Sequence, residues 1–343
     1  MINEIGRRVM QGGSRRSAIY ASLNWRHGDS QDFLAAKDWH NMPVGNTGQT
    51  LWDIKQTDFN FPAPLDMTNV SLNYDTEWLM QYYRTGKVGD VFLQNVRQAM
   101  QSAEPGFSFN FFDKENETLR NACTEVTSED DSDVCNLGSI NMGRISDINE
   151  MADVTELATK FLICGTLKAK LPYAKVYETR EKNRRLGLGL MGIHEWLIQR
   201  GSRYEVTPEL HKWLSTYKGI SDKVSKQTAD SLGISKPVAN RAIAPTGSIG
   251  ILAGTSTGVE PIFAVAYKRR YLKGGNKWHY QYVVDSAAQE LIDRYGASPD
   301  TVESALDLAD DYERRMAFQA DVQDYVDMSI SSTINLPAWG SKL

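Results

Sequence analysis

Cysteine is scarce in this sequence, with three among 343 residues. Three cysteines do not form the disulfide framework of small secreted domains, so we expect a reducing, cytoplasmic environment. Long apolar runs are also lacking. The longest fall far short of the roughly 18 residues that span a bilayer, and the N-terminal MINEIGRRVM has no signal-peptide core. We therefore expect neither a membrane span nor secretion.

A surplus of positive charge is missing as well. The 38 Lys and Arg residues are outnumbered by 43 Asp and Glu residues, which gives a net charge of −5. No global basic field attracts nucleic acid, so we expect no direct binding to it. The hydrophobic content of 41% is ample for one large core or two domains.

Strand-like and helix-like patterns alternate along the chain. The expected helices cover 76–102, 151–170, 186–200 and 208–231, the expected strands cover 67–73 and 107–112, a strand and helix share 21–39, and loops cover 50–62 and 130–132. This alternation predicts an α/β fold with a mainly parallel sheet. Periodicity alone does not distinguish a closed barrel from an open sheet.

The segment RNACTEVTSEDDSDVCNLGSIN carries the most chemistry. Asn121, Cys123 and Glu125 alternate, and alternate residues of an extended loop point to the same side. This set suits radical chemistry on a sugar, because a thiyl radical takes hydrogen from carbon and a carboxylate takes a hydroxyl proton. The amide would hold the hydroxyl. Cys135, twelve residues later, could supply reducing equivalents through a disulfide.

Other interpretations of these cysteines stay open at this point. A lone cysteine is often a small buried hydrophobe. Cys123 and Cys135 lack a CxxC motif and paired histidines, so they do not resemble a structural zinc site, and we expect no metal site. Cys164 lies in the apolar run FLICGTL, where we expect plain core.

A second stretch, NRAIAPTGSIGILAG, predicts an anion site. Its small residues with free backbone N–H groups lead into an expected helix. It is not a Walker A loop, since no GK[ST] follows, and an ordinary turn is the alternative. The glycines of LGLGLMGIHEWL are expected to permit close packing of a helix, in which the adjacent His194 and Glu195 have structural roles.

These motifs together resemble ribonucleotide reductases. Asn121-Ala-Cys123-Thr-Glu125 resembles the family's N-x-C-x-E finger loop, and Cys135–Asn141 resembles its C-N-L-x-S-I-N segment. The resemblance implies that Cys123 is the thiyl radical that abstracts the 3′ hydrogen of a ribonucleotide. It implies that Glu125 is the base for the 3′ hydroxyl and that Asn121 hydrogen-bonds the substrate. Cys135 would be one member of the redox pair that reduces the 2′ position.

Two further stretches extend the resemblance. The PTGSI loop, with GVEP downstream, is similar to the family's substrate-phosphate loop. The matching positions are Thr246, Gly247, Ser248 and Ile249. Gln11 and Arg15 fall in a stretch similar to the loop that links a dNTP effector site to the substrate base, with a solvated basic turn as the alternative.

The implied fold is a ten-stranded α/β barrel made of two halves of five parallel strands, incomplete at both ends. Residues 1–343 would form a single partial catalytic domain, with the finger loop at about 119–137 and the phosphate loop at about 244–250. No cysteine precedes Cys123, although the family carries its other redox cysteine on an earlier strand. We therefore expect a fragment or split-gene product without turnover alone. It would need a complementary chain with that cysteine and a thioredoxin-like reductant.

The classes of this family differ in the source of the radical. The short spacing between Cys123 and Cys135, and the ending SSTINLP, look more like the class that depends on adenosylcobalamin. A large subunit that receives its radical from a di-iron partner subunit is one alternative. A nucleotide-binding fragment without chemistry of its own is the other.

Overall fold

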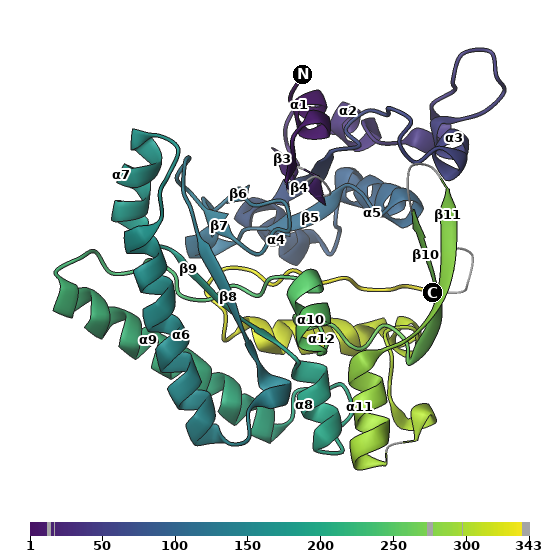
Figure 1. Cartoon of the computed structure of the whole chain (residues 1–343). Helices are drawn as coiled ribbons and strands as arrows, with labels where there is room; N and C mark the ends of the chain where they lie inside the picture. The colour runs from purple at the N-terminus through teal and green to yellow at the C-terminus, as the bar shows by residue number, and fades with distance from the viewer. Residues whose placement is uncertain (12–14, 17, 273–276, 297, 338–343) are drawn as a thin grey trace. The chain divides into compact units, whose positions relative to one another are not determined.

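The computed structural model describes residues 1–11, 15–16, 18–272, 277–296 and 298–337 (Figure 1). The chain divides into two compact units, which we describe separately. Unit 1 comprises Met1–Ala122, Thr127–Glu129 and Arg270–Tyr280, and unit 2 comprises Cys123–Val126, Asp130–Arg269 and Gln281–Leu343. Among the described residues, no helix has the length and apolarity needed to cross a membrane.

Unit 1 is built on a three-stranded parallel sheet. Its order is β3 (Ile19–Asn24), β4 (Thr68–Tyr74) and β5 (Gly106–Phe109), with β4 in the centre. The other elements are α1 (Ile2–Arg8), β1 (Met10–Gln11), β2 (Arg15–Arg16), α2 (Ser30–Ala35), η1 (Trp39–Asn41), α3 (Leu51–Thr57), α4 (Thr76–Thr85), α5 (Asp90–Ser102) and η2 (Phe112–Lys114). The expected strands over 67–73 and 107–112 are confirmed within a few residues, as is the strand and helix of 21–39.

The core of unit 1 lies where α2, α4 and α5 cover this sheet. Leu34, Leu72, Tyr74 and Trp78 are its buried centre. One expectation here is wrong, because part of the expected loop 50–62 is the helix α3. Thr50 and Asp53 form a reciprocal capping box at its start, which satisfies backbone donors that a short helix otherwise leaves open.

Unit 2 contains a second parallel sheet. β8 (Asn136–Asn141) pairs with β9 (Leu186–Met191) in register along all six residues. Isolated parallel bridges, Leu188 to Arg241 and Ile243 to Ile330, continue the same direction through two further extended segments. The expectation of a mainly parallel α/β fold is thus confirmed, and within the described residues the two parallel sheets are separate.

Unit 2 also contains several helices. They are α6 (Ile148–Lys168), α7 (Ala174–Asn183), α8 (Ile193–Gln199), α9 (Pro208–Leu232), α10 (Gly247–Ala253), α11 (Ser286–Tyr295) and α12 (Tyr312–Gln323), with η3 (Met142–Arg144), η4 (Pro299–Thr301) and η5 (Asp307–Ala309) between them. Figure 1 shows α6 beside α9, and α6 also packs on β8 and β9. Two more strands, β10 (Ala266–Leu272) and β11 (Trp278–Val284), pair with each other.

The expected helix over 186–200 is wrong in its first half. Leu186–Met191 is the fully buried strand β9, and the helix begins only at Ile193. The glycines of LGLGLM let neighbouring backbones approach on one side. A Cβ atom at Gly189 would lie 2.6 Å from the carbonyl oxygen of Ala242. Helices over 151–170 and 208–231 are confirmed as α6 and α9.

Candidate functional site

The predicted finger loop is a short hairpin. β6 (Leu119–Arg120) pairs antiparallel with β7 (Thr127–Ser128), and residues 121–126 form the turn. The expectation of an extended loop is wrong here, because the chain reverses within six residues and Thr124 takes a φ of +68°. Cys123 is exposed and Glu125 is only 1% exposed, so alternate residues of the turn have different surroundings.

The boundary between the two units passes through this turn. On the side of unit 1, the side-chain amide of Asn69 donates a 2.8 Å hydrogen bond to the carbonyl of Ala122, next to Asn121. Within unit 2, the carbonyl oxygen of Glu125 accepts a 2.9 Å hydrogen bond from the N–H of Ser329. These two hydrogen bonds hold the backbone carbonyls of Ala122 and Glu125, on either side of Cys123.

Cys135 lies close to the same turn within unit 2. Val126 and Cys135 both pack against a small buried cluster of Ala239, Ala242 and Met328. Ala242 stands four residues before Thr246, in the extended segment that leads to the predicted phosphate loop. The structure therefore brings together Val126, Cys135 and the approach to Thr246, which are far apart in the sequence.

The electrostatic surroundings of Cys135 favour a protonated thiol. Burial raises its pKa to about 12; the positive charge of Arg185 opposes this rise, while Asp133 and Glu125 add to it. Arg185 donates a 2.9 Å hydrogen bond to Asp133, and these side chains are 3% and 6% exposed. A thiol with this pKa stays an S–H group at neutral pH, a hydrogen donor and not a thiolate nucleophile.

The predicted phosphate loop leads into a helix, as expected. α10 begins at Gly247, and the preceding Thr246 has a left-handed backbone with φ +50°. The Thr246 hydroxyl accepts a 2.8 Å hydrogen bond from the N–H of Gly258. Gly258 also has a positive φ, and a Cβ there would lie 2.9 Å from the Ala244 carbonyl oxygen. The hydrogen bond from Gly258 to Thr246 therefore ties the segment after α10 to the residue before it.

A cavity of about 730 Å³ in unit 2 adjoins this loop, and we call it the α10 cavity. Gly247 and Ile251 of α10 line it, together with Glu260 of the GVEP stretch and Thr333 of SSTINLP. Glu260 joins two motifs, because its carboxylate accepts a 2.6 Å hydrogen bond from the N–H of Thr333 and pairs with Arg315 of α12 at 3.0 Å.

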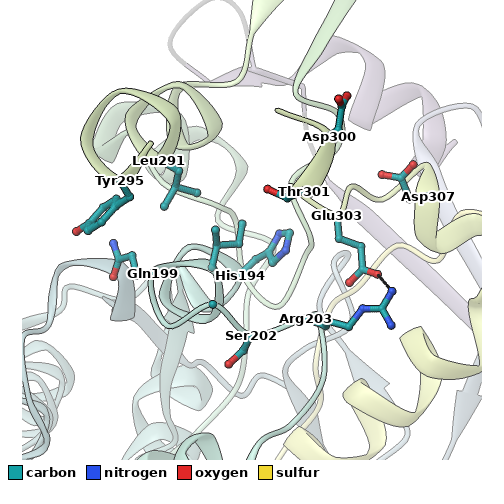
Figure 2. A pocket seen from close by; sticks show the side chains of 12 residues that line it. His194, Gln199, Ser202, Arg203, Leu291, Tyr295, Asp300, Thr301, Glu303 and Asp307 are labelled. Carbon is teal, nitrogen blue, oxygen red and sulfur yellow. Dashed lines mark ion pairs between the residues drawn. The ribbon is translucent and has the colours of Figure 1, made fainter. Parts of the chain in front are cut away.

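A second cavity of unit 2, of about 750 Å³, lies between α8, α11 and η4 (Figure 2). Glu303 in its wall is already paired, since it binds Arg314 through two hydrogen bonds and lies 3.8 Å from Arg203. His194 is buried; burial lowers its pKa to about 4, and its Nδ1 accepts a 2.9 Å hydrogen bond from the N–H of Ile262. None of the predicted site residues lines this cavity.

Other predicted residues lie elsewhere. Gln11 pairs with Arg15 across β1 and β2 in unit 1, and their side chains lie outside the described part of the chain. The expectation that Cys164 is core is wrong. It is exposed, because α6 buries its neighbours Leu162 and Ile163 and turns Cys164 to the opposite face. In the described ranges, no group of three or more His, Cys, Asp or Glu side chains could hold a metal ion.

Sequence reasoning missed several residues of this region. Neither Arg185 nor Arg315 was singled out by its position in the sequence, and Arg315 meets Glu260 across 55 positions. Thr255 and Glu195 were also missed as partners, and they hydrogen-bond across 60 positions. For each of them the residue type was visible, but the partner was set only by folding.

The family model described as "Ribonucleotide reductase, barrel domain" matches residues 67–214 and 238–341. The chain belongs to this family. Its fold is that of the ribonucleotide reductase barrel, as expected, although the two parallel sheets of the described residues do not close. A solved structure titled a B-12 dependent (class II) ribonucleotide reductase matches 92% of this chain and 46% of its own, with a TM-score of 0.64 at 17% identity.

Curated relatives carry matching names. The putative adenosylcobalamin-dependent ribonucleoside-triphosphate reductase of Mycobacterium phage D29 is 27% identical over 96% of this chain and 51% of its own length. The vitamin B12-dependent ribonucleoside-diphosphate reductase of Thermoplasma acidophilum is 26% identical over 96% and 48%. The chain thus spans about half the length of these curated reductases. An Actinobacillus ureae class Id alpha subunit has a similar fold, with a TM-score of 0.63 at 15% identity over 90% of this chain and 63% of its own.

Proposed function

We propose that this chain forms part of the catalytic barrel of a ribonucleotide reductase that converts ribonucleotides into 2′-deoxyribonucleotides by thiyl-radical chemistry. The main support is the cluster in unit 2 that gathers Val126 of the finger turn, Cys135 and Ala242 before the phosphate loop. A radical thiol, a reducing thiol and a phosphate site must all reach one nucleotide, and this cluster links the three segments that would carry them.

The proposed roles follow the order of the reaction. The thiol of Cys123 gives up a hydrogen atom, and the resulting thiyl radical removes the 3′ hydrogen of the ribose. Glu125 takes the proton of the 3′ hydroxyl, and Asn121 holds the substrate by a hydrogen bond. The 2′ hydroxyl then leaves as water, and the 3′ hydrogen returns from Cys123 at the end.

The net reduction needs two electrons and two protons. Cys135 and a second thiol supply them together and become a disulfide, while the substrate loses its 2′ oxygen as water. The high pKa of Cys135 supports this role, because a protonated thiol carries the hydrogen that the reaction consumes. The second thiol would come from a complementary polypeptide or from protein outside these 343 residues. A thioredoxin-like dithiol would reduce the disulfide again.

Nucleotide binding is proposed for two loops. The small residues of the phosphate loop allow their backbone N–H groups to approach a phosphate closely. These are Thr246, Gly247, Ser248 and Ile249. Gln11 and Arg15 are proposed to communicate with a dNTP effector. Their support is the antiparallel pairing of β1 with β2, which sets Gln11 opposite Arg15.

Adenosylcobalamin is the proposed cofactor, on the names of the relatives. The α10 cavity, of about 730 Å³, has a size common for drug-sized ligands, which suits the adenosyl group and not the whole cofactor. Ile251, Phe263 and Tyr267 in its wall would hold the adenosyl group by apolar contact. When bound, the cofactor supplies the radical that oxidises Cys123.

The test is a reductase assay of the complex between this chain and the polypeptide that supplies the second thiol, with adenosylcobalamin and a dithiol. Turnover should appear, and Cys123→Ser should abolish it while ADP binding persists. Turnover retained in Cys123→Ser would refute the central assignment. Activity only with a di-iron subunit would favour that class, and nucleotide binding without turnover under either condition would indicate an inactive fragment.

A further inference from the structure

Three segments of unit 2 meet beneath the phosphate loop. Asn141 ends β8, Glu195 lies in the first turn of α8, and Thr255 follows α10 directly. The Thr255 hydroxyl oxygen lies 3.1 Å from Oδ1 of Asn141 and 2.5 Å from a carboxyl oxygen of Glu195. One hydroxyl therefore joins the strand of the predicted redox segment to the exit of the predicted phosphate helix.

The surroundings are shaped for this contact. Glu195 is 1% exposed and Thr255 is 7% exposed. Nearby glycines provide the space that the Glu195 and Thr255 side chains occupy. A Cβ at Gly143 would lie 2.6 Å from the carboxyl carbon of Glu195. A Cβ at Gly192, where φ is +71°, would lie 2.7 Å from the Thr255 hydroxyl. No side chain fits at either position without moving the cluster.

The hydrogens available to Glu195, Thr255 and Asn141 indicate which group donates to which. A threonine hydroxyl donates one hydrogen and also accepts, so it cannot donate to Asn141 and Glu195 at once. If the Glu195 carboxyl is protonated, it donates to Thr255, which then donates to Asn141, and every group is satisfied. Burial raises the pKa of Glu195, which favours this state; the Thr255 hydrogen bond and Arg144 oppose it.

The charged neighbours of Glu195 are largely committed elsewhere. Arg144 comes within 4.0 Å of the Glu195 carboxyl but is held by Glu290 of α11 through two hydrogen bonds, one of 2.7 Å. Glu290 and Asp285 both add negative charge that raises the pKa of Glu195 further. The group that shares the buried contact with Glu195 is therefore the hydroxyl of Thr255 and not a full counter-charge.

We propose that Glu195 and Thr255 are positioning residues that hold α10 and its phosphate loop in place relative to β8. Thr255 transmits this placement directly, because its N–H donates to the carbonyl of Gly250 in α10 at 3.0 Å and its side chain lines the α10 cavity. The neighbouring Ser256 is fixed to the start of α8 through its carbonyl, which accepts a 2.8 Å hydrogen bond from Gly192. The link to nucleotide binding rests on the proposed function.

The experiment compares matched variants of the full chain. Thr255→Val keeps the shape and removes the hydroxyl, and Thr255→Ser keeps the hydroxyl. Glu195→Leu removes the acid, and Glu195→Gln keeps a donor that can reach Thr255. Amide hydrogen exchange of residues 247–253 reports the order of α10, and calorimetric titration with ADP reports phosphate binding.

Thr255→Val and Glu195→Leu should each speed exchange in α10 and weaken ADP binding roughly tenfold, the size expected when a buried partner is left unsatisfied. Thr255→Ser and Glu195→Gln should match the unmodified chain, and exchange in α6 should stay constant in all four. Unchanged α10 exchange in Thr255→Val, or failure of both conservative variants to restore it, would overturn the inference. Faster α10 exchange in a chain that never binds ADP would support the positioning role and refute the proposed function.

Discussion

The central strands of the two sheets differ in what surrounds them. β4 in unit 1 ends in an aromatic cluster, where Trp78 stacks on Phe92 with ring centroids 4.9 Å apart and Tyr74 lies 5.1 Å from Trp78. β9 in unit 2 is glycine-rich and is bracketed by two buried ionisable groups, Arg185 before it and Glu195 after it. The aromatic side chains fill the core beside the first sheet, although β4 itself also buries the polar residues Ser71 and Asn73.

Burying polar groups near the second sheet costs desolvation free energy, so these groups occur with hydrogen-bonded or charged partners that fix their geometry. The proposed chemical groups Cys123, Glu125, Cys135 and the phosphate loop are all attached to unit 2. Unit 2 thus carries these proposed chemical groups, whereas the aromatic cluster beside β4 belongs to the apolar core of unit 1. Four measurements test this difference between the units.

The largest expected effect concerns the thiol of Cys135. Burial raises its pKa to about 12 in the folded chain, from the ordinary value of 9.0, so its thiolate fraction at pH 8 is much smaller than in the unfolded chain. Iodoacetamide should therefore label Cys135 much faster in urea than in the native chain, as measured by peptide mass spectrometry. The exposed Cys164 serves as the internal control. Equal rates for Cys135 in both conditions would contradict the buried, polar description of this site.

The second-largest expected effect is the destabilisation of unit 2 when a buried charge is removed. The Arg241 side chain is 1% exposed and pairs with Asp222 at 2.6 Å and Asp327 at 2.7 Å. Arg241→Ala leaves both carboxylates without their cation and should lower the free energy of unfolding of unit 2 by about 3–4 kcal/mol. Urea titration measures this, with the exposed Lys236→Ala as control. A loss below about 1 kcal/mol would mean that unit 2 does not depend on its buried ion pairs.

A cavity in the core of unit 1 should lower the free energy of unfolding by a similar amount, but the effect should lie in unit 1 and not in unit 2. Leu72 of β4 is fully buried, and Leu72→Ala should destabilise unit 1 by about 3 kcal/mol through lost contacts and a residual void. Hydrogen exchange should locate the effect in β3, β4 and β5. The half-exposed Leu93→Ala is the control. Equal protection loss in β8 and β9 would show that the two cores are not independent.

The smallest effect is a pH dependence in unit 1. Burial opposes ionisation of Asp66, but hydrogen bonds from Asn3, Arg7 and Lys55 outweigh it and lower the pKa below 3.8. A lowered folded pKa adds stability above the unfolded value, and this is lost as pH falls through the folded pKa. Thermal unfolding between pH 5 and about pH 2 should lose part of its acid sensitivity in Asp66→Asn. An unchanged acid profile in that variant would contradict the assignment.

Much of the fold was predictable, and its errors have local causes. The helices α6 and α9 follow from apolar spacing because each buries one continuous face. β9 was mistaken for a helix because it is buried on both sides, so glycine and not a polar residue alternates with leucine in LGLGLM and the usual apolar–polar alternation of a strand is missing. Cys164 was mistaken for core because an apolar run does not show which face of a helix is covered.

The candidate site, like the fold, was predicted only in part. The resemblance of the motifs to the family predicted the segment with Cys123 and Glu125, the thiol of Cys135 and the loop at Thr246, since the residues of each motif are close in sequence. It did not show that the finger turn is tight, or that Glu125 is buried while Cys123 is exposed. Those properties depend on packing around Ser329 and Val126.

The sequence alone was enough to recognise the family, the helices with one apolar face and the residues proposed for radical chemistry. The partners of the buried polar groups became visible only in the folded chain: Glu260 with Arg315, Arg185 with Asp133, and Glu195 with Thr255. The physical reason is that spacing along the chain reports local periodicity. A buried polar group instead takes whichever partner the packing of distant segments brings within hydrogen-bond distance.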